Sequence, residues 1–338
     1  MSSQPRTTPN PATSKVLGAL LGVHAGDSLG ATLEFKPWRM IRTKYPNGLR
    51  EIIGGGSFGW PAGHATDDTD LTRAVLLAYL DRSAHAQTHT TATPAQPFDL
   101  TRTAADHCLS WYNGDWPGRT PGSSPRDIGG ATDTGLSNYE ASGNPLTSGA
   151  GPDSAGNGSL MRCVATGLFT AGREDRIKES KAISAITHND VRCTISCAVY
   201  NEMVAALLAG KTPAEAVQIG CEVASELDCP AVEAALRRGE EVSLEQFASE
   251  GPASDFPDWS SGYVLQSLSL AVAALLDARS FEDVLVDVVR IGGDTDTNGA
   301  IAGGLLGARE GVEGIPERWL EKLQFREEFE EGVRKMLG

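Results

Sequence analysis

Carboxylate and hydroxyl side chains gather in two short segments that lie far apart in the sequence. Residues 63–70 read G-H-A-T-D-D-T-D, and residues 291–299 read I-G-G-D-T-D-T-N-G, with Asp294 and Asp296 between flexible glycines and the start of a small-residue helix. Concentrating five carboxylates in these segments is unfavourable unless each is solvated or a cation neutralises the group. Oxygen ligands of this kind suit hard divalent cations such as Mg²⁺ or Mn²⁺. We therefore predict that the two segments meet in the fold around metal.

Helix capping is the simpler explanation for the first acidic segment. Thr and Asp are favoured at helix starts, and a helix is expected to begin at Thr66 or Asp67 and to run through Leu80. A cap needs one such side chain, whereas Asp67, Asp68 and Asp70 supply three carboxylates. This excess favours metal ligation.

A third polar segment could bind an anion. Residues 156–162 read G-N-G-S-L-M-R and precede an apolar helix that is expected to extend through Phe169. Glycine-rich backbone leading into a helix N-terminus presents N–H groups to anions, although the same residues also mark any tight turn. Asp153, just before this segment, is either a turn residue or a ligand contact. His188, at a helix junction, is by position alone a cap or a satisfied polar residue.

Glu34 directly follows the first expected helix, in a segment that reads D-S-L-G-A-T-L-E-F over residues 27–35. A carboxylate at a helix C-terminus is disfavoured by the helix dipole. As a solvated loop acid Glu34 would be unremarkable, whereas near a pair of metal ions it would be a candidate general acid or base.

Two helices that must position these segments carry glycine at every fourth residue. The glycines are Gly18, Gly22, Gly26 and Gly30 in the first helix and Gly299, Gly303, Gly307 and Gly311 in the late one. Each interior glycine costs a helix about 0.5–1 kcal/mol relative to alanine. Close helix–helix approach is the compensating reason, so we predict that both helices lie deep in the core, where one could pack against the other.

Helical patterns recur along the whole chain, while the alternation typical of β-strands is nearly absent. We predict an all-α fold in which residues 14–338 form one domain, because the candidate site residues are spread along its length. The first helix is expected to begin at Lys15, with Ser14 as its cap. Residues 1–13 are rich in Ser, Thr and Pro and are expected to be a disordered leader, and residues 83–97 are expected to be an exposed loop.

Composition excludes several classes of function. The chain of 338 residues carries 29 basic and 44 acidic residues, for a net charge of −15, and has no Lys/Arg stripe that could neutralise phosphate backbones. We therefore expect no nucleic-acid partner. No uninterrupted apolar run reaches the length of a membrane span, so no membrane partner is expected either. The six cysteines form no C-x-x-C pair and are expected to be reduced, buried thiols of a monomeric cytoplasmic protein.

Seven motifs, taken in order, resemble those of the ADP-ribosylglycohydrolase family. They are G-x-x-x-G-D-S-L-G-A-x-x-E-F (residues 22–35), G-x-x-T-D-D-T (63–69), D-I-G-G-A-T (127–132), G-N-G-S-L-M-R (156–162), I-T-H (186–188), S-G-Y-V (261–264) and G-G-D-T-D-T-N-G-A-I-A-G (292–303). One such motif would be weak evidence, whereas the whole series in one order is strong evidence.

The resemblance implies an all-α orthogonal helical bundle with two divalent cations, Mg²⁺ or Mn²⁺, in a cleft. It also implies hydrolysis of the bond between ADP-ribose and an acceptor. Carried over motif by motif, the implied metal ligands are Thr66, Asp67, Asp68, Asp294, Asp296 and Thr297. The implied contacts with ADP-ribose are Asp153, Asn157, Gly158, Ser159, Met161, His188, Tyr263 and Gly293. The implied catalytic residues are Glu34, Asp67, Asp68 and Asp296, with proton transfer by Glu34 or by an aspartate of the site.

The implied substrate is an ADP-ribosylated protein. Mono-ADP-ribosylated arginine is the first expectation, because residues 156–162 look most like the bacterial arginine-type enzymes. The alternatives are serine-linked or O-acetyl-ADP-ribose, an immunity role against an antibacterial toxin, and a non-catalytic relative that binds ADP-ribose. Outside the resemblance, the same aspartates could belong to a binuclear phosphoesterase, which should not require residues 156–162. Residues 83–97 and 113–130 carry no signature that identifies the acceptor.

Overall fold

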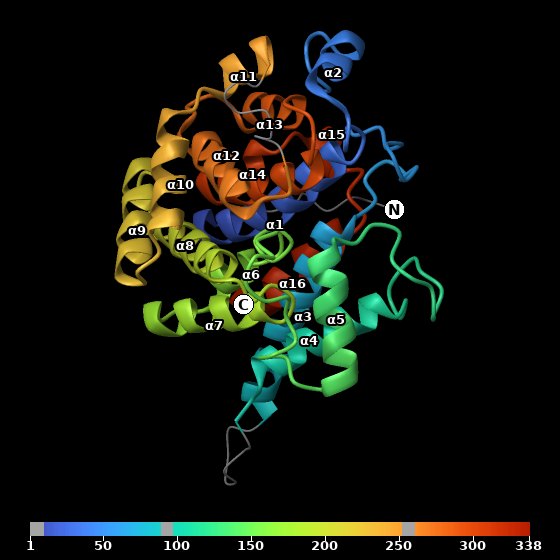
Figure 1. Cartoon of the computed structure of the whole chain (residues 1–338), viewed down its shortest axis with the longest axis vertical. Helices are drawn as coiled ribbons and strands as arrows, with labels where there is room; N and C mark the ends of the chain where they lie inside the picture. Colours follow the sequence, from blue (N-terminus) through green and yellow to red (C-terminus); the bar gives the residue numbers. More distant parts are fainter. Residues whose placement is uncertain (1–9, 89–96, 252–260) are drawn as a thin grey trace.

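The computed structural model describes residues 10–88, 97–251 and 261–338, and within these ranges the protein is built from α-helices (Figure 1). No strand is found in this part of the chain, where strand-like pairing is limited to isolated bridges. The helices are α1 (Pro11–Gly30), α2 (Trp38–Lys44), α3 (Asp67–Thr88), α4 (Leu100–Tyr112), α5 (Gly130–Ser142), α6 (Val164–Phe169), α7 (Arg173–Ala185), α8 (Val191–Leu208), α9 (Pro213–Glu226), α10 (Pro230–Glu241), α11 (Leu244–Glu250), α12 (Val264–Leu276), α13 (Phe281–Arg290), α14 (Thr295–Glu310), the 3₁₀ turn η1 (Val312–Gly314), α15 (Glu317–Leu320) and α16 (Arg326–Leu337). The predicted all-α fold is confirmed.

α1 and α14 lie side by side in the middle of the molecule and pack in antiparallel register through their glycines (Figure 1). A Cβ built on Gly22 would lie 2.2 Å from the carbonyl oxygen of Gly303, and one built on Gly26 would lie 2.0 Å from that of Gly299. No side chain fits at such distances, so only glycine lets the two backbones approach this closely. The prediction that both helices are buried is confirmed, and each is the other's neighbour.

This register brings the end of one helix to the beginning of the other. Gly30, the last residue of α1, lies against Thr295, the first residue of α14, and the Thr295 hydroxyl donates to the Gly30 carbonyl oxygen at 2.7 Å. Glu34 follows shortly after α1, while Asp294 and Asp296 flank the start of α14. The glycine contacts therefore bring together carboxylates from opposite ends of the chain.

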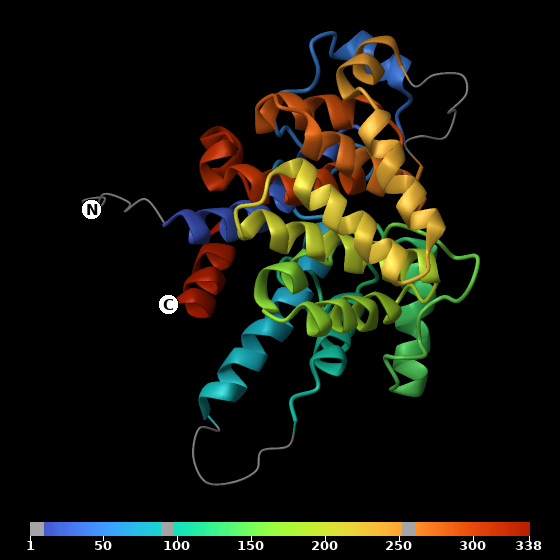
Figure 2. The same cartoon turned by 90° about the vertical axis from the view of Figure 1, so that its left-hand side faces the viewer.

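The other helices enclose this central pair. α12 and α13 pack on α14, α3 packs on α1 and α4, and α9 and α10 lie beside each other on one face of the molecule (Figure 2). α8 packs against α6, α7 and α9. By length and composition α8 could cross a membrane, but 78% of that helix is buried inside the protein, as in a core helix.

Two helix boundaries differ from those expected. α1 begins at Pro11, inside the segment predicted as a disordered leader, because proline suits a first helical turn and the Asn10 side chain accepts the N–H of Thr13 at 2.9 Å. α3 continues to Thr88, so it takes up the first part of the loop expected at residues 83–97. Residues 1–9 and 89–96 lie outside the described residues. All six cysteines are free and buried, as predicted.

Candidate functional site

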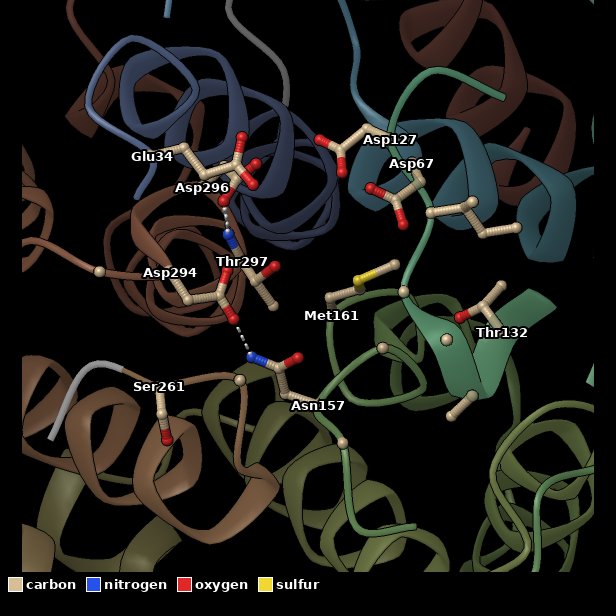
Figure 3. Close-up of a pocket in the computed structure, with 18 of the residues that line it drawn as sticks. Glu34, Asp67, Asp127, Thr132, Asn157, Met161, Ser261, Asp294, Asp296 and Thr297 are labelled. Carbon is tan, nitrogen blue, oxygen red and sulfur yellow. Dashed lines mark hydrogen bonds between the residues drawn. The ribbon is translucent and has the colours of Figure 1, made fainter. Parts of the chain in front are cut away.

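A cavity of about 460 Å³, termed the main cavity, opens where the end of α1 meets the starts of α3 and α14. Figure 3 shows Glu34 and Asp296 on one side of this space, Asp67 and Asp127 on another, and Asn157 below them. The lining comprises Glu34, Phe35, Asp67, residues 127–132, residues 156–158, Met161, His188, Ser261, Gly262, Gly293, Asp294, Asp296 and Thr297. Most of the predicted site residues therefore border a single space.

α3 can begin with several aspartates because another helix supplies its cap. Asp27 of α1 accepts hydrogen bonds at Oδ2 from the backbone N–H groups of Thr66 and Thr69, at 3.1 and 3.2 Å. The carboxylate thus satisfies N–H groups that the start of a helix leaves free. Asp67 and Asp68 are not needed as caps, so helix capping does not explain the acidic segment.

The two acidic segments meet at Asp68. Its Oδ2 accepts hydrogen bonds from the hydroxyl of Thr66 at 3.1 Å and from the hydroxyl of Thr297 at 3.4 Å. The side chain is buried, and Oδ1 has no hydrogen-bond partner among the described residues. The predicted meeting of residues 63–70 with residues 291–299 is confirmed.

Asp294 connects the late acidic segment to the glycine-rich loop of residues 156–162. Asn157 donates from Nδ2 to Asp294 Oδ2 at 2.7 Å (Figure 3) and to Ser267 Oγ at 3.0 Å. Asp294 lies at the N-terminus of α14, where the helix dipole stabilises a carboxylate. The orientation of Asn157 in the cavity therefore depends on an aspartate that is itself a predicted metal ligand.

Burial and mutual repulsion raise the pKa values of the carboxyls around the main cavity. Burial, followed by the charges of Asp127 and Asp294, raises the pKa of Glu34 to about 9. Burial is also the largest cause that raises the pKa values of Asp67 and Asp296 well above the usual range for aspartate. Glu34 therefore retains its proton at neutral pH unless a positive charge compensates it.

Asp127 belongs to this cluster and is absent from the predicted site residues. Glu34, Asp127 and Asp296 each offer one carboxylate oxygen, and these atoms lie within 4.8 Å of one another. Burial, followed by the charge of Asp27, raises the pKa of Asp127 to about 7. The available sequence signal was the motif D-I-G-G-A-T, in which Asp127 lies two residues before the first of the two glycines at the start of α5.

The oxygen atoms at the site fit the chemistry of hard divalent cations. Among the described residues, four buried carboxylate oxygens near the cavity have no hydrogen-bond partner, namely Asp27 Oδ1, Glu34 Oε2, Asp68 Oδ1 and Asp127 Oδ2. Buried polar atoms are nearly always satisfied by protein, water or ions. Mg²⁺ and Mn²⁺ prefer carboxylate and hydroxyl oxygens, which are the donors available here. The residues that could hold them are Thr66, Asp67, Asp68, Asp294, Asp296 and Thr297, with Glu34 and Asp127 close by.

His188 packs directly against the glycine-rich loop. A Cβ built on Gly158 would lie 2.9 Å from His188 Cε1, so the ring occupies the space that a side chain would need. Burial lowers the pKa of His188 to about 3, which leaves the ring neutral. Thr187 Oγ1 accepts a hydrogen bond from Arg162 at 2.7 Å and shares a second hydrogen bond with His188 Nδ1 at 2.8 Å, which fixes the orientation of the ring.

Three predicted contacts with ADP-ribose lie outside the lining of the main cavity. Ser159 is fully buried, and its hydroxyl oxygen accepts a hydrogen bond from Ser184 Oγ at 2.8 Å. The Asp153 side chain extends into solvent. The ring of Tyr263 lies 5.8 Å from the guanidinium carbon of Arg192. The other predicted contacts line the main cavity, namely Asn157, Gly158, Met161, His188 and Gly293.

The metal-free protein is expected to lose stability as the pH rises. A carboxyl with a raised pKa holds its proton more tightly in the folded state. Its contribution to stability is therefore complete below the unfolded pKa and is lost as the pH rises through the folded pKa. The pKa rises from 3.8 to about 7 for Asp127 and from 4.5 to about 9 for Glu34. Thermal unfolding in EDTA should therefore show a midpoint that falls between about pH 5 and about pH 9.

Added Mg²⁺ should oppose this loss. Cations bind carboxylates in their deprotonated form, so protons compete with them. The rise in unfolding midpoint on adding Mg²⁺ should be larger at about pH 8 than at about pH 5. Equal rises at both pH values would show that this cluster does not bind the ion.

Comparison with known proteins gives concordant matches over nearly the whole chain. A family model described as ADP-ribosylglycohydrolase matches residues 8–338. The chain is 28% identical over 334 residues to ADP-ribosylarginine hydrolase Tri1 of Pseudomonas putida, and the match covers 97% of this chain and 79% of that protein. It is 30% identical over 318 residues to the ADP-ribosyl-[dinitrogen reductase] glycohydrolase of Rhodospirillum rubrum, and this match covers 94% of this chain and 92% of that protein. A solved structure described as an ADP-ribosylglycohydrolase-related protein complex has a TM-score of 0.74 at 28% identity, covering 97% of this chain and 98% of that one.

Proposed function

This chain belongs to the ADP-ribosylglycohydrolase family of enzymes, and from this premise we propose a specific substrate and a metal dependence for its removal of ADP-ribose. The proposed substrate is a protein that carries mono-ADP-ribose on arginine, and the bond cleaved is the N-glycosidic bond. The similarity to an ADP-ribosylarginine hydrolase supports the arginine linkage. The proposed cofactors are two divalent cations, Mg²⁺ or Mn²⁺.

The main observation in support is the cluster of buried carboxylates around the main cavity. Asp68 and Thr297 join the two acidic segments, and Glu34, Asp127 and Asp296 bring three carboxylate oxygens within 4.8 Å of one another. A purely structural role would not require so many buried acids that lack a positive partner. Cation binding accounts for their presence.

Cleavage of the bond passes through an oxocarbenium-like state and needs a water nucleophile and a proton for the leaving nitrogen. Bound divalent cations would hold ribose hydroxyls and lower the pKa of a water molecule. Glu34 is the residue that we assign to proton transfer. Its carboxyl faces the cavity, and burial, the largest cause of its raised pKa, favours the protonated form that a general acid needs.

The glycine-rich loop is proposed to bind the ADP-ribose group. Asn157 and the glycines on either side of it, Gly156 and Gly158, line the main cavity. Arg162 fixes the loop, because its guanidinium donates to the carbonyl oxygen of Gly158 at 2.8 Å and to Thr187. His188 also lines the main cavity, and its neutral ring can form a hydrogen bond with a hydroxyl group of the ligand.

The test is release of ADP-ribose from an arginine-ADP-ribosylated protein, measured with Mg²⁺ or Mn²⁺ and again with EDTA. We expect release only when the divalent cation is present. Serine-linked and O-acetyl-ADP-ribose serve as comparison substrates, and faster release from either would contradict the arginine assignment. Hydrolysis of a generic phosphodiester that survives Asn157→Ala would instead indicate a binuclear phosphoesterase. Binding of ADP-ribose without any hydrolysis would refute the enzymatic role.

A further inference from the structure

A second cavity, termed the side cavity, has a volume of about 380 Å³ and shares Asp67 and Asp127 with the main cavity. Its other walls include Trp60, His64 and side chains from residues 118–126. The shared carboxylates belong to the cluster at which the glycosidic bond would be cleaved. A group attached to the anomeric carbon could therefore extend from the main cavity into the side cavity. The acceptor side chain of an ADP-ribosylated protein is such a group.

Trp60 and His64 stack on each other and form one wall of the side cavity. Their ring centroids are 5.0 Å apart and their planes differ by 21°. The backbone of Trp60 exchanges two hydrogen bonds with Gly55, at 2.7 and 2.8 Å, which fix its place in the loop. Nε1 of the indole is buried and has no hydrogen-bond partner among the described residues. Because the Trp60 ring lines the side cavity, a ligand held there can pack against it.

A guanidinium of the protein itself already lies against this wall. The guanidinium carbon of Arg126 is 5.9 Å from the centroid of the Trp60 ring, within the range of a cation–π interaction. Arg126 is exposed. The guanidinium of Arg119 differs, because it is held by the backbone carbonyls of Trp111 and Ser123. Trp60 therefore already contacts a guanidinium, which is the group that a modified arginine would present. The side chain that supplies it, Arg126, is exposed and can move.

His64 adds a hydrogen-bond acceptor to the wall. Its Nδ1 lies 2.5 Å from the carbonyl oxygen of Ala65, and because a carbonyl can only accept, the proton is on Nδ1. In the neutral ring Nε2 is then an acceptor. A guanidinium has donors along its whole edge and needs acceptors around it, which His64 Nε2 and the carboxylates of Asp67 and Asp127 can supply.

We infer that the side cavity is the acceptor site, in which the guanidinium of an ADP-ribosylated arginine stacks on Trp60 and donates to His64 Nε2. This inference rests on the proposed function, because it requires ADP-ribose in the main cavity. The side chain of Arg126 has to move aside when the substrate enters, so it competes with the substrate guanidinium for Trp60. A serine acceptor has no planar cation and would gain nothing from this wall.

The binding test does not require catalysis. N-acetyl-arginine methylamide is titrated by NMR into metal-loaded protein saturated with ADP-ribose, with N-acetyl-serine methylamide as the comparison probe. We expect Trp60→Ala to weaken binding of the arginine probe by about 10-fold, and Trp60→Phe to stay within about 3-fold of wild type. Arg126→Ala should strengthen binding by about 3-fold, because a competitor is removed.

The matched controls are Trp38→Ala and Arg42→Ala. The guanidinium carbon of Arg42 lies 5.1 Å from the centroid of the Trp38 ring, and neither residue lines either of the two cavities. Each variant therefore removes one member of a comparable cation–π pair elsewhere in the protein. Both should bind the arginine probe as the wild type does. In steady-state assays with the arginine-linked substrate, Trp60→Ala should raise KM by about 10-fold and change kcat by less than about 3-fold.

The inference is overturned if the wild type does not bind the arginine probe, or if it binds the serine probe equally well. It is also overturned if Trp60→Ala keeps wild-type affinity for the arginine probe while still binding ADP-ribose. Probe binding that depends on Trp60, in a protein that hydrolyses no arginine-linked ADP-ribose, would support the side cavity and refute the proposed function. Hydrolysis of arginine-linked ADP-ribose with a KM that is unchanged in Trp60→Ala would support the proposed function and refute the side cavity as the acceptor site.

Discussion

Replacing Asp296 with asparagine is expected to lower kcat/KM for ADP-ribose release by at least about 10³-fold. Asp296 is a predicted metal ligand from the start of α14, and its carboxylate oxygen lies within 4.8 Å of oxygens from Glu34 and Asp127. The amide keeps the shape of the side chain but removes the charge that a divalent cation requires. Single-turnover release of ADP-ribose over a range of Mg²⁺ concentrations would measure the loss.

The same substitution should raise stability when no cation is present. Burial and the charges of Asp68 and Glu34 raise the pKa of Asp296 well above its usual range, so ionising it in the folded protein is unfavourable. The neutral amide does not carry this cost. Thermal unfolding in EDTA at about pH 8 should therefore give a higher midpoint for Asp296→Asn than for the wild type. A lower midpoint would indicate that the carboxylate is structural.

Asp277→Asn is the matched control for this pair of effects. Asp277 directly follows α12, away from both cavities, and its Oδ2 accepts a hydrogen bond from Arg279 Nη2 at 2.7 Å. Burial opposes ionisation of Asp277, but the hydrogen bonds from Arg279 outweigh it and lower the pKa, so the charged form stabilises the folded protein. The loss of this carboxylate should reduce the free energy of unfolding by about 1 kcal/mol and leave kcat/KM close to the wild-type value. The two substitutions should thus change stability in opposite directions and activity to very different degrees.

Replacing Gly26 with alanine is expected to reduce the free energy of unfolding by about 3 kcal/mol or more. The added Cβ would lie 2.0 Å from the carbonyl oxygen of Gly299, and the obstacle is backbone, which cannot rotate away. α1 and α14 would have to separate, which would also move Glu34 away from Asp296. Urea unfolding followed by circular dichroism would measure the change.

Gly151→Ala is the control for the glycine substitution. A Cβ on Gly151 would meet no atom within 4 Å, and its backbone does not have a positive φ. The free energy of unfolding should change by less than about 0.5 kcal/mol. If Gly26→Ala were as mild, the close approach of α1 and α14 would not be essential for stability.

The residue types at the site could be predicted from sequence because the relevant signals are local. Asp67 and Asp68 exceed what a helix start needs as a cap, and the structure shows that Asp27 provides the cap instead. The glycine spacing of the two helices predicted close packing, because repeated glycines in a helix are costly unless another backbone approaches. These inferences depend on neighbours within a few turns of helix, which the sequence contains directly.

Some features of the site could not be predicted in this way. Asp127 joins the cluster through a loop whose course depends on the packing around α5, and its motif alone did not distinguish it from a turn residue. Ser159 and Asp153 lie in or beside the segment that was expected to bind ADP-ribose, yet one is buried beneath the loop and the other extends into solvent. A motif places a residue in a segment but does not say which way its side chain points.

The sequence by itself determined the helical class, the acidic segments, the glycine-rich loop and the pair of glycine-lined helices. Only the tertiary structure decided which of these elements meet. The antiparallel register of α1 and α14 places Gly30 against Thr295 and so brings Glu34 to the acidic segment at the start of α14, and the Trp60–His64 wall adjoins the same carboxylates through the side cavity. Register and cavity shape depend on contacts between residues far apart in the chain, and no local spacing encodes those distances.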